Sequence, residues 1–185
     1  ALDHQNILGN TVGEIATEKA GIIKKNTVII SGDENEKVKS IIRNKAAENN
    51  SDWVDATLIK VKLPSDLKGN YQQKNIKVVL AVIDELRNLG MEIPAEKVKS
   101  GLLNVQQNTG FIGRWFEFSR DPLIICDTGH NQAGLEEVFA QLNSIPKFKH
   151  IILGFVKDKK IDEVLKILPE NSTFYFAKPY LNRGL

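Results

Sequence analysis

The sequence predicts an α/β protein. Segments with helical and strand-like periodicity alternate along the 185 residues, and the second half reads strand, helix, strand, helix, strand, which is typical of a parallel sheet of the nucleotide-binding type. That order runs over residues 123–126, 133–142, 150–153, 161–168 and 173–176. With 42% apolar and 26% charged residues the composition is that of an ordinary globular protein, which excludes wholesale disorder.

The first half also alternates. Apolar residues at helical spacing predict helices over 12–23, 35–49, 71–89 and 95–103. Two short apolar or alternating runs, 27–30 and 57–63, predict strands. Gly90 lies where a helix C-terminus belongs, and Pro94 precedes the last helix at a position that favours initiation. The lysines of 35–49 are expected on the solvated face of that helix.

A domain boundary is predicted at the loop 108–113, which contains two glycines and no helical period. The chain would then comprise one part over 1–108 and a second over 109–185, with a strand at 114–118 following the loop. Ala1 and the single Met91 favour an excised piece of a longer protein over a whole translation product.

Composition and charge also narrow the classes of binding partner and the cellular compartment that can be expected. A net charge of +2, dispersed along the chain, gives no argument for nucleic acid, and no apolar run approaches the roughly 20 residues that span a membrane. The single cysteine, Cys126, cannot form an internal disulfide, which favours a reducing, cytoplasmic location. Because Cys126 ends an apolar run, it is expected to be an inert core residue.

The first candidate site is the segment Asp127-Thr128-Gly129-His130-Asn131, directly after the strand 123–126. Ligands of open α/β sheets bind beyond the carboxyl ends of strands. There Asp127 can accept hydrogen bonds from a ribose, while His130 and Asn131 can donate to phosphate oxygens. The alternative is that Asp127 and Asn131 only cap the next helix.

Three other positions carry potential chemistry. Arg114, between Gly113 and Trp115, can stack on adenine or pair with phosphates, or form a surface salt bridge. The lysines of 154–159 suit an anion, although solvated lysines are the favoured interpretation. Lys19 shares the apolar face of its helix, which predicts partial burial and therefore a lysine that is paired or chemically active.

Six segments in this order resemble the folylpolyglutamate synthase and dihydrofolate synthase family, part of the Mur ligase superfamily. They are Leu2-Asp3-His4 with Leu8-Gly9 and Thr11, then 15–24 (IATEKAGIIK), 73–75 (QKN), 109–115 (TGFIGRW), 127–131 (DTGHN) and 154–159 (GFVKDK). Two positions depart from the family pattern: Gly129 stands where alanine is usual, and Gln132 where proline is usual. No G-x-x-x-x-G-K-[ST] phosphate loop occurs in the chain.

The resemblance implies a fold and an activity. Residues 1–108 would be the C-terminal part of a central ATP-binding domain and 109–185 a Rossmann-like C-terminal domain, with ATP between them. The family adds L-glutamate to tetrahydrofolate or dihydropteroate through an acyl phosphate, using ATP and Mg²⁺, and is generally monomeric. Because the phosphate loop is missing, this chain alone is not expected to be active.

The resemblance also implies roles for six residues. His4 would bind Mg²⁺ and Lys19 would be carbamylated. Asn75, Arg114 and Asp127 would contact ATP, and His130 would support catalysis beside the nucleotide. Two alternatives stay open: a Mur-type ligase acting on UDP-muramyl peptides, and a non-catalytic nucleotide-binding module.

Overall fold

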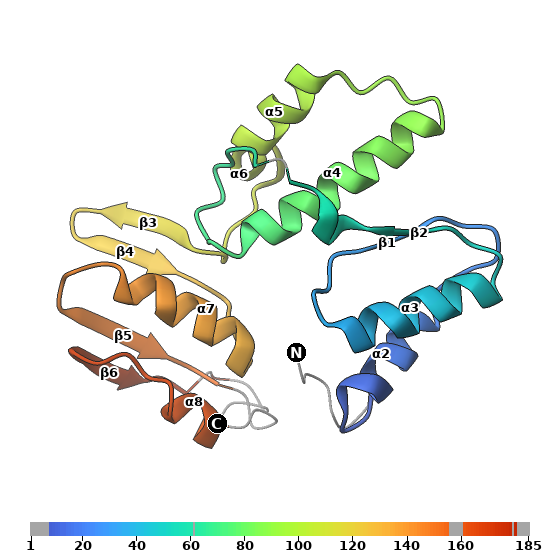
Figure 1. Cartoon of the computed structure of the whole chain (residues 1–185). Coiled ribbons are helices and arrows are strands. Elements are labelled where there is room, and N and C mark those ends of the chain that lie inside the picture. Colours follow the sequence, from blue (N-terminus) through green and yellow to red (C-terminus); the bar gives the residue numbers. More distant parts are fainter. Residues whose placement is uncertain (1–7, 61, 156–160, 179, 181–185) are drawn as a thin grey trace. The chain divides into compact units, whose positions relative to one another are not determined.

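The computed structural model of the chain describes residues 8–60, 62–155, 161–178 and 180. The chain divides into two compact units (Figure 1), of which the first comprises Ala1–Asp66 with Tyr71–Thr109 and the second Leu67–Asn70 with Gly110–Leu185. The assignment of 1–108 and 109–185 to a central and a C-terminal ligase domain stays a prediction.

Five helices of the first unit lie within the described residues: α2 (Val12–Ala20), α3 (Glu36–Glu48), α4 (Gln72–Asn88), α5 (Ala95–Leu103) and α6 (Val105–Thr109). The first four confirm the helices predicted from periodicity. Their ends follow local chemistry: Thr11 and Glu14 form a capping box on α2, and the Asn35 side chain accepts from two backbone N–H groups of α3. Gly90 follows α4 with φ +91°, the left-handed conformation that ends many helices.

The strands of the first unit differ partly from prediction. β1 (Ile29–Ser31) pairs in parallel with β2 (Trp53–Asp55), in the register Ile29 with Trp53. The predicted strand over 57–63 is wrong, because η1 (Ala56–Leu58) is a 3₁₀ turn. The Asp55 carboxylate accepts from the Thr57 backbone N–H at 2.9 Å, and this bond turns the chain away from the extended conformation.

One buried apolar cluster of the first unit lies between α4 and α5. Ile76 from α4 packs with Val98 and Leu102 from α5, and partly buried apolar side chains surround them: Leu63, Leu80, Ile83 and Ile93. Burial of this apolar surface holds the two helices together.

In the second unit, β3 (Phe116–Arg120) and β4 (Leu123–Cys126) form an antiparallel pair, and β5 (Lys149–Leu153) pairs in parallel with β6 (Ser172–Phe176). Helices α7 (Gln132–Asn143) and α8 (Ile161–Leu165) follow β4 and β5. The predicted α/β architecture is confirmed, and the chain passes between the parallel strands β5 and β6 through α8 as the βαβ pattern requires. The strand 123–126, predicted to belong to the same parallel sheet, pairs antiparallel with β3 instead.

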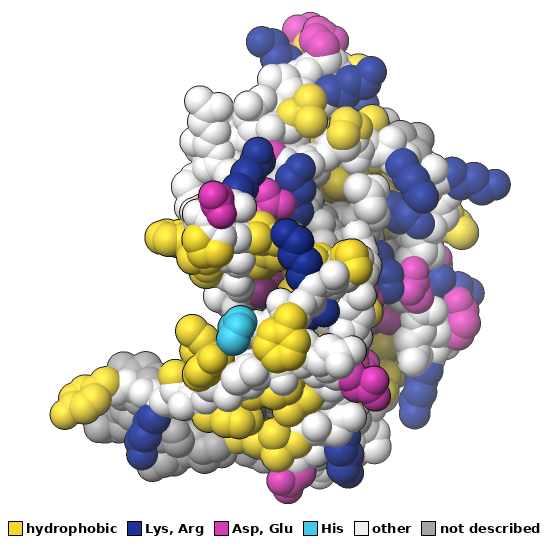
Figure 2. All heavy atoms as spheres, turned by 90° about the vertical axis from the view of Figure 1, so that its left-hand side faces the viewer, with side chains coloured by type: hydrophobic (Ala, Val, Ile, Leu, Met, Phe, Trp, Pro, Cys, Tyr) yellow, Lys and Arg dark blue, Asp and Glu magenta, His cyan; other side chains and the backbone are white. Residues whose placement is uncertain are grey.

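The two faces of β5 differ in exposure. Ile151 and Leu153 are buried, as are Leu135, Val138 and Phe139 of α7, whereas Ile152 is 74% exposed. Figure 2 shows hydrophobic side chains, in yellow, at the surface of the molecule. None of the helices in the described part of the chain has the length and apolar character that crossing a bilayer requires.

The prediction that Cys126 is a core residue is wrong, since its side chain is exposed. Leu123 and Ile124 of the same strand are also exposed, at 44% and 42%. An apolar run predicts a strand, but only the elements that pack on the strand determine which residues they cover.

Candidate functional site

Two loops that are separate in the sequence meet beside the β3–β4 hairpin. The antiparallel register pairs Phe116, the first residue of β3, with Cys126, the last residue of β4. The residues before β3 therefore lie against the residues after β4. This places Gly113-Arg114-Trp115 beside Asp127-Thr128, two of the segments singled out in the sequence.

Four hydrogen bonds organise these two loops. The carbonyl oxygen of Gly113 accepts from both the backbone N–H and the hydroxyl of Thr128, each at 2.8 Å. The Asp127 carboxylate accepts from the Trp115 N–H and from the Gly129 N–H, each at 2.7 Å. Three of the bonds join the loops, and the fourth shapes the turn after β4. We call these two segments, 113–115 and 127–131, the paired loops.

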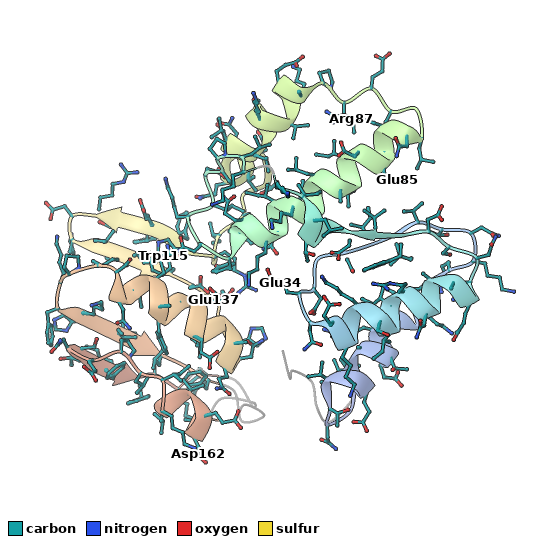
Figure 3. All side chains as sticks on the ribbon, viewed as in Figure 1. Glu34, Glu85, Arg87, Trp115, Glu137 and Asp162 are labelled. Carbon is teal, nitrogen blue, oxygen red and sulfur yellow. The ribbon has the colours of Figure 1, made fainter. Side chains whose placement is uncertain are left out.

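The paired loops need unusual backbone conformations. Gly113 has φ +93°, and a Cβ there would lie 2.9 Å from Thr128 Cγ2. Trp115 has φ +47° and is only 4% exposed; Figure 3 labels its side chain. A non-glycine residue with positive φ is strained unless its surroundings hold it, and here burial of the indole and the bond to Asp127 do so.

Arg114 lies between these fixed residues but is itself only loosely held. Its Nη1 is 3.8 Å from Asp127 Oδ1, with 37% of the Arg114 side chain exposed against 8% for Asp127. This is a long, single contact rather than a bidentate pair, so most of the five guanidinium N–H donors are not committed to it. Arg114 can therefore meet an anionic ligand without breaking the loop that carries it.

The two interpretations of the Asp127 segment each account for different residues. Asn131 caps α7, since its side chain accepts from the Gly134 N–H at 2.8 Å. The N-cap of α7 is Asn131, and the Asp127 carboxylate bonds the Trp115 and Gly129 N–H groups. His130 is exposed, with Nδ1 3.2 Å from the Thr128 carbonyl oxygen, and because a carbonyl only accepts, Nδ1 carries the proton of that bond.

Two predicted site residues lie in the first unit, on helices. Asn75 is exposed in α4 and donates from Nδ2 to Gln72 Oε1 at 2.8 Å. Lys19 is exposed in the last turn of α2, so the prediction that it is partly buried is wrong. The buried residues of α2 are Gly13, Ile15, Ala16 and Ala20; near the end of a helix a long lysine side chain reaches water even from an apolar stripe.

His4 and residues 156–160, which include the lysines after β5, lie outside the described residues. Among the residues that are described, no group of three or more His, Cys, Asp or Glu side chains could hold a metal ion. The structure thus brings Arg114, Asp127 and His130 together in the paired loops, while Lys19 and Asn75 belong to the other unit.

Sequence reasoning missed a buried ion pair in the first unit. Lys39 is 8% exposed, and its Nζ lies 3.1 Å from Asp55 Oδ2, 3.2 Å from Glu36 Oε1 and 3.2 Å from Thr57 Oγ1. The expectation that the lysines of α3 are all solvated is wrong for this residue. Lys39 lies three residues before Ile42 and seven before Ala46, so helical spacing places it on the face of these apolar residues. This pattern could have predicted its burial.

The ion pair changes the acid–base properties of both partners. Hydrogen bonds to the Asp55 and Glu36 carboxylates hold the pKa of Lys39 above its usual value. For Asp55, burial opposes ionisation, but hydrogen bonds from Thr57 and Lys39 outweigh it and lower the pKa of the carboxyl. The pair fastens α3 to the end of β2, so it stabilises the fold of the first unit.

No protein-family model matches the chain, but curated proteins do. The chain is 27% identical to a folylpolyglutamate synthase of Lacticaseibacillus casei, over 86% of this chain and 42% of that protein. It is 29% identical to a probable dihydrofolate synthetase of Schizosaccharomyces pombe, over 90% of this chain and 45% of that protein. The chain thus spans less than half the length of these relatives.

Solved structures give the same comparison. E. coli FolC in complex with ADP matches all of this chain and 47% of its own, with a TM-score of 0.79 and 25% identity. A Mycobacterium tuberculosis folylpolyglutamate synthase complexed with ADP matches with a TM-score of 0.84 at 21% identity, which shows the shared fold.

The fold and the paired loops define an α/β protein of the type that binds ligands at strand ends. More particularly, the chain is similar in sequence and fold to folylpolyglutamate synthases and dihydrofolate synthases, which confirms the resemblance carried by its motifs.

Proposed function

We propose that this chain supplies nucleotide-contacting residues of an ATP-dependent ligase that joins L-glutamate to a folate or dihydropteroate. The observation that carries the proposal is the pair of loops, which hold Arg114, Asp127 and His130 within one hydrogen-bonded arrangement. The relatives named as folate ligases support the substrate class, and the ADP in the related FolC structure supports a nucleotide.

The proposed reaction has two steps. A substrate carboxylate attacks the γ-phosphorus of ATP; a new P–O bond forms, the bond to the ADP oxygen breaks, and an acyl phosphate results. The glutamate amine then attacks the acyl carbon, phosphate leaves, and the nitrogen loses a proton to give the amide. Both steps develop negative charge on phosphate oxygens, so they need positioned N–H donors more than covalent help from the protein.

The described residues can meet this need in different ways. Arg114 offers guanidinium donors for phosphate oxygens, and His130 lies on the neighbouring loop with Nδ1 bonded to the Thr128 carbonyl oxygen. Asp127 has a positioning role through Trp115 and Gly129, and a carboxylate is the chemical group that accepts hydrogen bonds from a ribose hydroxyl. Asn75 would read the adenine.

Two parts of the proposal rest on the resemblance alone. Mg²⁺, when bound, would offset phosphate charge, and the residue expected to hold it, His4, lies outside the described residues. Carbamylation of Lys19 would join its nitrogen to carbon dioxide with loss of a proton. Because Lys19 is exposed, burial gives no independent support for a neutral amine at that position.

The proposal is tested by nucleotide binding to Arg114→Ala, with Arg120→Ala as matched control. Arg120 follows on the same hairpin and its side chain is 85% exposed. Calorimetric titration with ADP is expected to show about a tenfold loss of affinity for Arg114→Ala, the effect of one charge-assisted contact, and no loss for Arg120→Ala. Equal affinities in the two variants would contradict the proposal.

Turnover separates the alternatives. A protein that contains this chain is expected to release ADP with tetrahydrofolate or dihydropteroate plus glutamate, and not with a UDP-muramyl substrate. The reverse preference indicates the Mur-type alternative, and nucleotide binding without turnover of either substrate indicates the non-catalytic module.

A further inference from the structure

Thr128 donates two hydrogen bonds to one acceptor in the paired loops. Its backbone N–H and its hydroxyl each lie 2.8 Å from the carbonyl oxygen of Gly113. Because a carbonyl oxygen only accepts, the hydroxyl is the donor of the second bond. The backbone N–H is present in any residue other than proline at position 128, whereas the hydroxyl requires threonine or serine.

The acceptor belongs to the peptide unit that leads into Arg114. The carbonyl of Gly113 and the N–H of Arg114 lie in one plane, so the direction of the carbonyl sets the orientation of that plane. Gly113 has φ +93°, and a glycine restricts the rotation of its neighbouring peptide units less than any other residue does. The hydrogen bonds from Thr128 therefore hold a plane that the glycine leaves free to turn.

The residue after Arg114 is held independently. The Trp115 N–H donates to the Asp127 carboxylate at 2.7 Å, and Trp115 is only 4% exposed. With the peptide plane before Arg114 and the residue after it both held, the Arg114 side chain leaves the backbone in a defined direction. Its guanidinium makes a long contact, 3.8 Å from Nη1 to Asp127 Oδ1, so its approach to a ligand depends on that direction.

Contact with Gly113 also keeps the Thr128 side chain in place. A Cβ on Gly113 would lie 2.9 Å from Thr128 Cγ2, so the methyl group stands against the glycine that carries the bonded carbonyl. Threonine is branched at Cβ, which restricts rotation about χ1. The methyl contact and the hydroxyl bond therefore favour the same rotamer. The bond from His130 Nδ1 goes to the backbone carbonyl of Thr128 and does not depend on this side chain.

We propose that Thr128 is a positioning residue for Arg114: through its hydroxyl it holds the peptide unit from which Arg114 reaches the phosphates of the nucleotide. This inference rests on the proposed function, in which Arg114 contacts those phosphates. Thr128 acts through Arg114, and the test measures that dependence.

The test compares the affinity for ADP of the chain and its variants by calorimetric titration. Thr128→Val removes the hydroxyl at nearly the same volume and is expected to weaken ADP binding about threefold, the effect of losing one exposed hydrogen bond. Thr128→Ser keeps the hydroxyl and is expected to stay within about 1.5-fold of the unmodified chain.

Dependence on Arg114 is measured by repeating the substitution in an Arg114→Ala background. Without the guanidinium Thr128 has no group to position, so Thr128→Val should change the affinity there by less than about 1.5-fold. A role that only maintains the hairpin, or that supports another nucleotide contact, would weaken ADP binding in both backgrounds. A similar loss in both backgrounds therefore overturns the inference.

Thr17→Val is the matched control, because the Thr17 hydroxyl also donates to a glycine carbonyl, that of Gly13 at 2.9 Å, but within α2. It is expected to leave the affinity unchanged, and a loss as large as that of Thr128→Val overturns the inference. An unchanged affinity in Thr128→Val, or an equal loss in Thr128→Ser, also overturns it. If Thr128→Val does not fold, Thr128→Ala is the second variant, with the same expected loss and the same dependence on Arg114.

The same measurements separate this inference from its premise. If the unmodified chain does not bind ADP, or if Arg114→Ala binds it as tightly, the proposed function fails and the inference fails with it. If Arg114→Ala weakens ADP binding and Thr128→Val does not, only the inference fails.

Discussion

The two units present their candidate residues in opposite ways. In the first unit, Lys19 and Asn75 project from helices whose ends are set by local sequence, and each is exposed. In the second unit, Arg114, Asp127 and His130 lie on the paired loops, which hydrogen-bond to each other at the open end of the β3–β4 hairpin. Residues on helices are positioned one at a time, whereas the paired loops position theirs together.

This comparison predicts that substitutions in the paired loops cost stability as well as binding, while those at the exposed helix positions affect binding alone. Substitutions in both units test this prediction.

The largest effect is expected for Asp127→Ala. It leaves the Trp115 and Gly129 N–H groups without their acceptor, and we expect a loss of about 2–4 kcal/mol in the free energy of unfolding. Urea denaturation followed by fluorescence of Trp115, in a Trp53→Phe background, measures this loss. The control is Asp162→Ala, at an exposed position of α8 that Figure 3 labels, which should cost under about 0.5 kcal/mol. Similar losses in both variants would contradict the difference in stability expected between the paired loops and exposed helix positions.

Gly113→Ala is expected to cost about 2 kcal/mol, because alanine disfavours φ +93° and its Cβ would press on Thr128. Gly110→Ala is the control: it has φ +65° with no atom near the added Cβ, so only the backbone cost of about 1 kcal/mol remains. Thermal unfolding of the two variants should differ in that order. Equal melting temperatures would show that the Thr128 side chain moves away from the added Cβ without a loss of stability.

In the first unit, Asp55→Asn is expected to cost about 1 kcal/mol at neutral pH by weakening the contact with Lys39. Because the folded-state pKa of Asp55 is lowered from 3.8, its contribution is present above that value and is lost as the pH falls through the lowered pKa. Urea midpoints of the unmodified chain and the variant should therefore converge in acid. A gap that stays constant down to pH 2 would contradict this assignment.

The smallest effect is expected for Lys19→Ala, within about 0.5 kcal/mol in stability, because the side chain is exposed in the last turn of α2. Thermal unfolding measures it, with exposed Lys97 of α5 changed to alanine as control. A larger loss for Lys19 alone would mean that its side chain is structural, and the contrast between the units would weaken.

Local sequence predicts the structure correctly where local interactions determine it. The bounds of α5 match prediction at both ends, and α3 and α4 lie within a residue of it. Helix caps, glycine at a helix end and apolar spacing act over four residues or fewer, so they can be recognised without knowing the fold. The motif 127–131 is recognisable for the same reason, as a polar turn directly after an apolar strand.

The errors concern residues whose surroundings come from distant segments. The strand over 57–63 failed because Asp55 turns the chain at Thr57, and Lys39 is buried because β2 brings Asp55 to it across sixteen positions of sequence. Cys126 and Lys19 are exposed although both lie in apolar patterns. Burial depends on what covers a residue, and periodicity carries no such information.

The sequence by itself determined the α/β alternation, the helices and the identity of the candidate residues. Only the tertiary structure decided that Gly113-Arg114-Trp115 meets Asp127-Thr128, and that Lys39 of α3 meets Asp55 at the end of β2. The physical reason is the same in both cases: hydrogen bonds form between groups that the strand register and the packed helix face bring within about 3 Å, and these distances are set by the fold rather than by spacing along the chain.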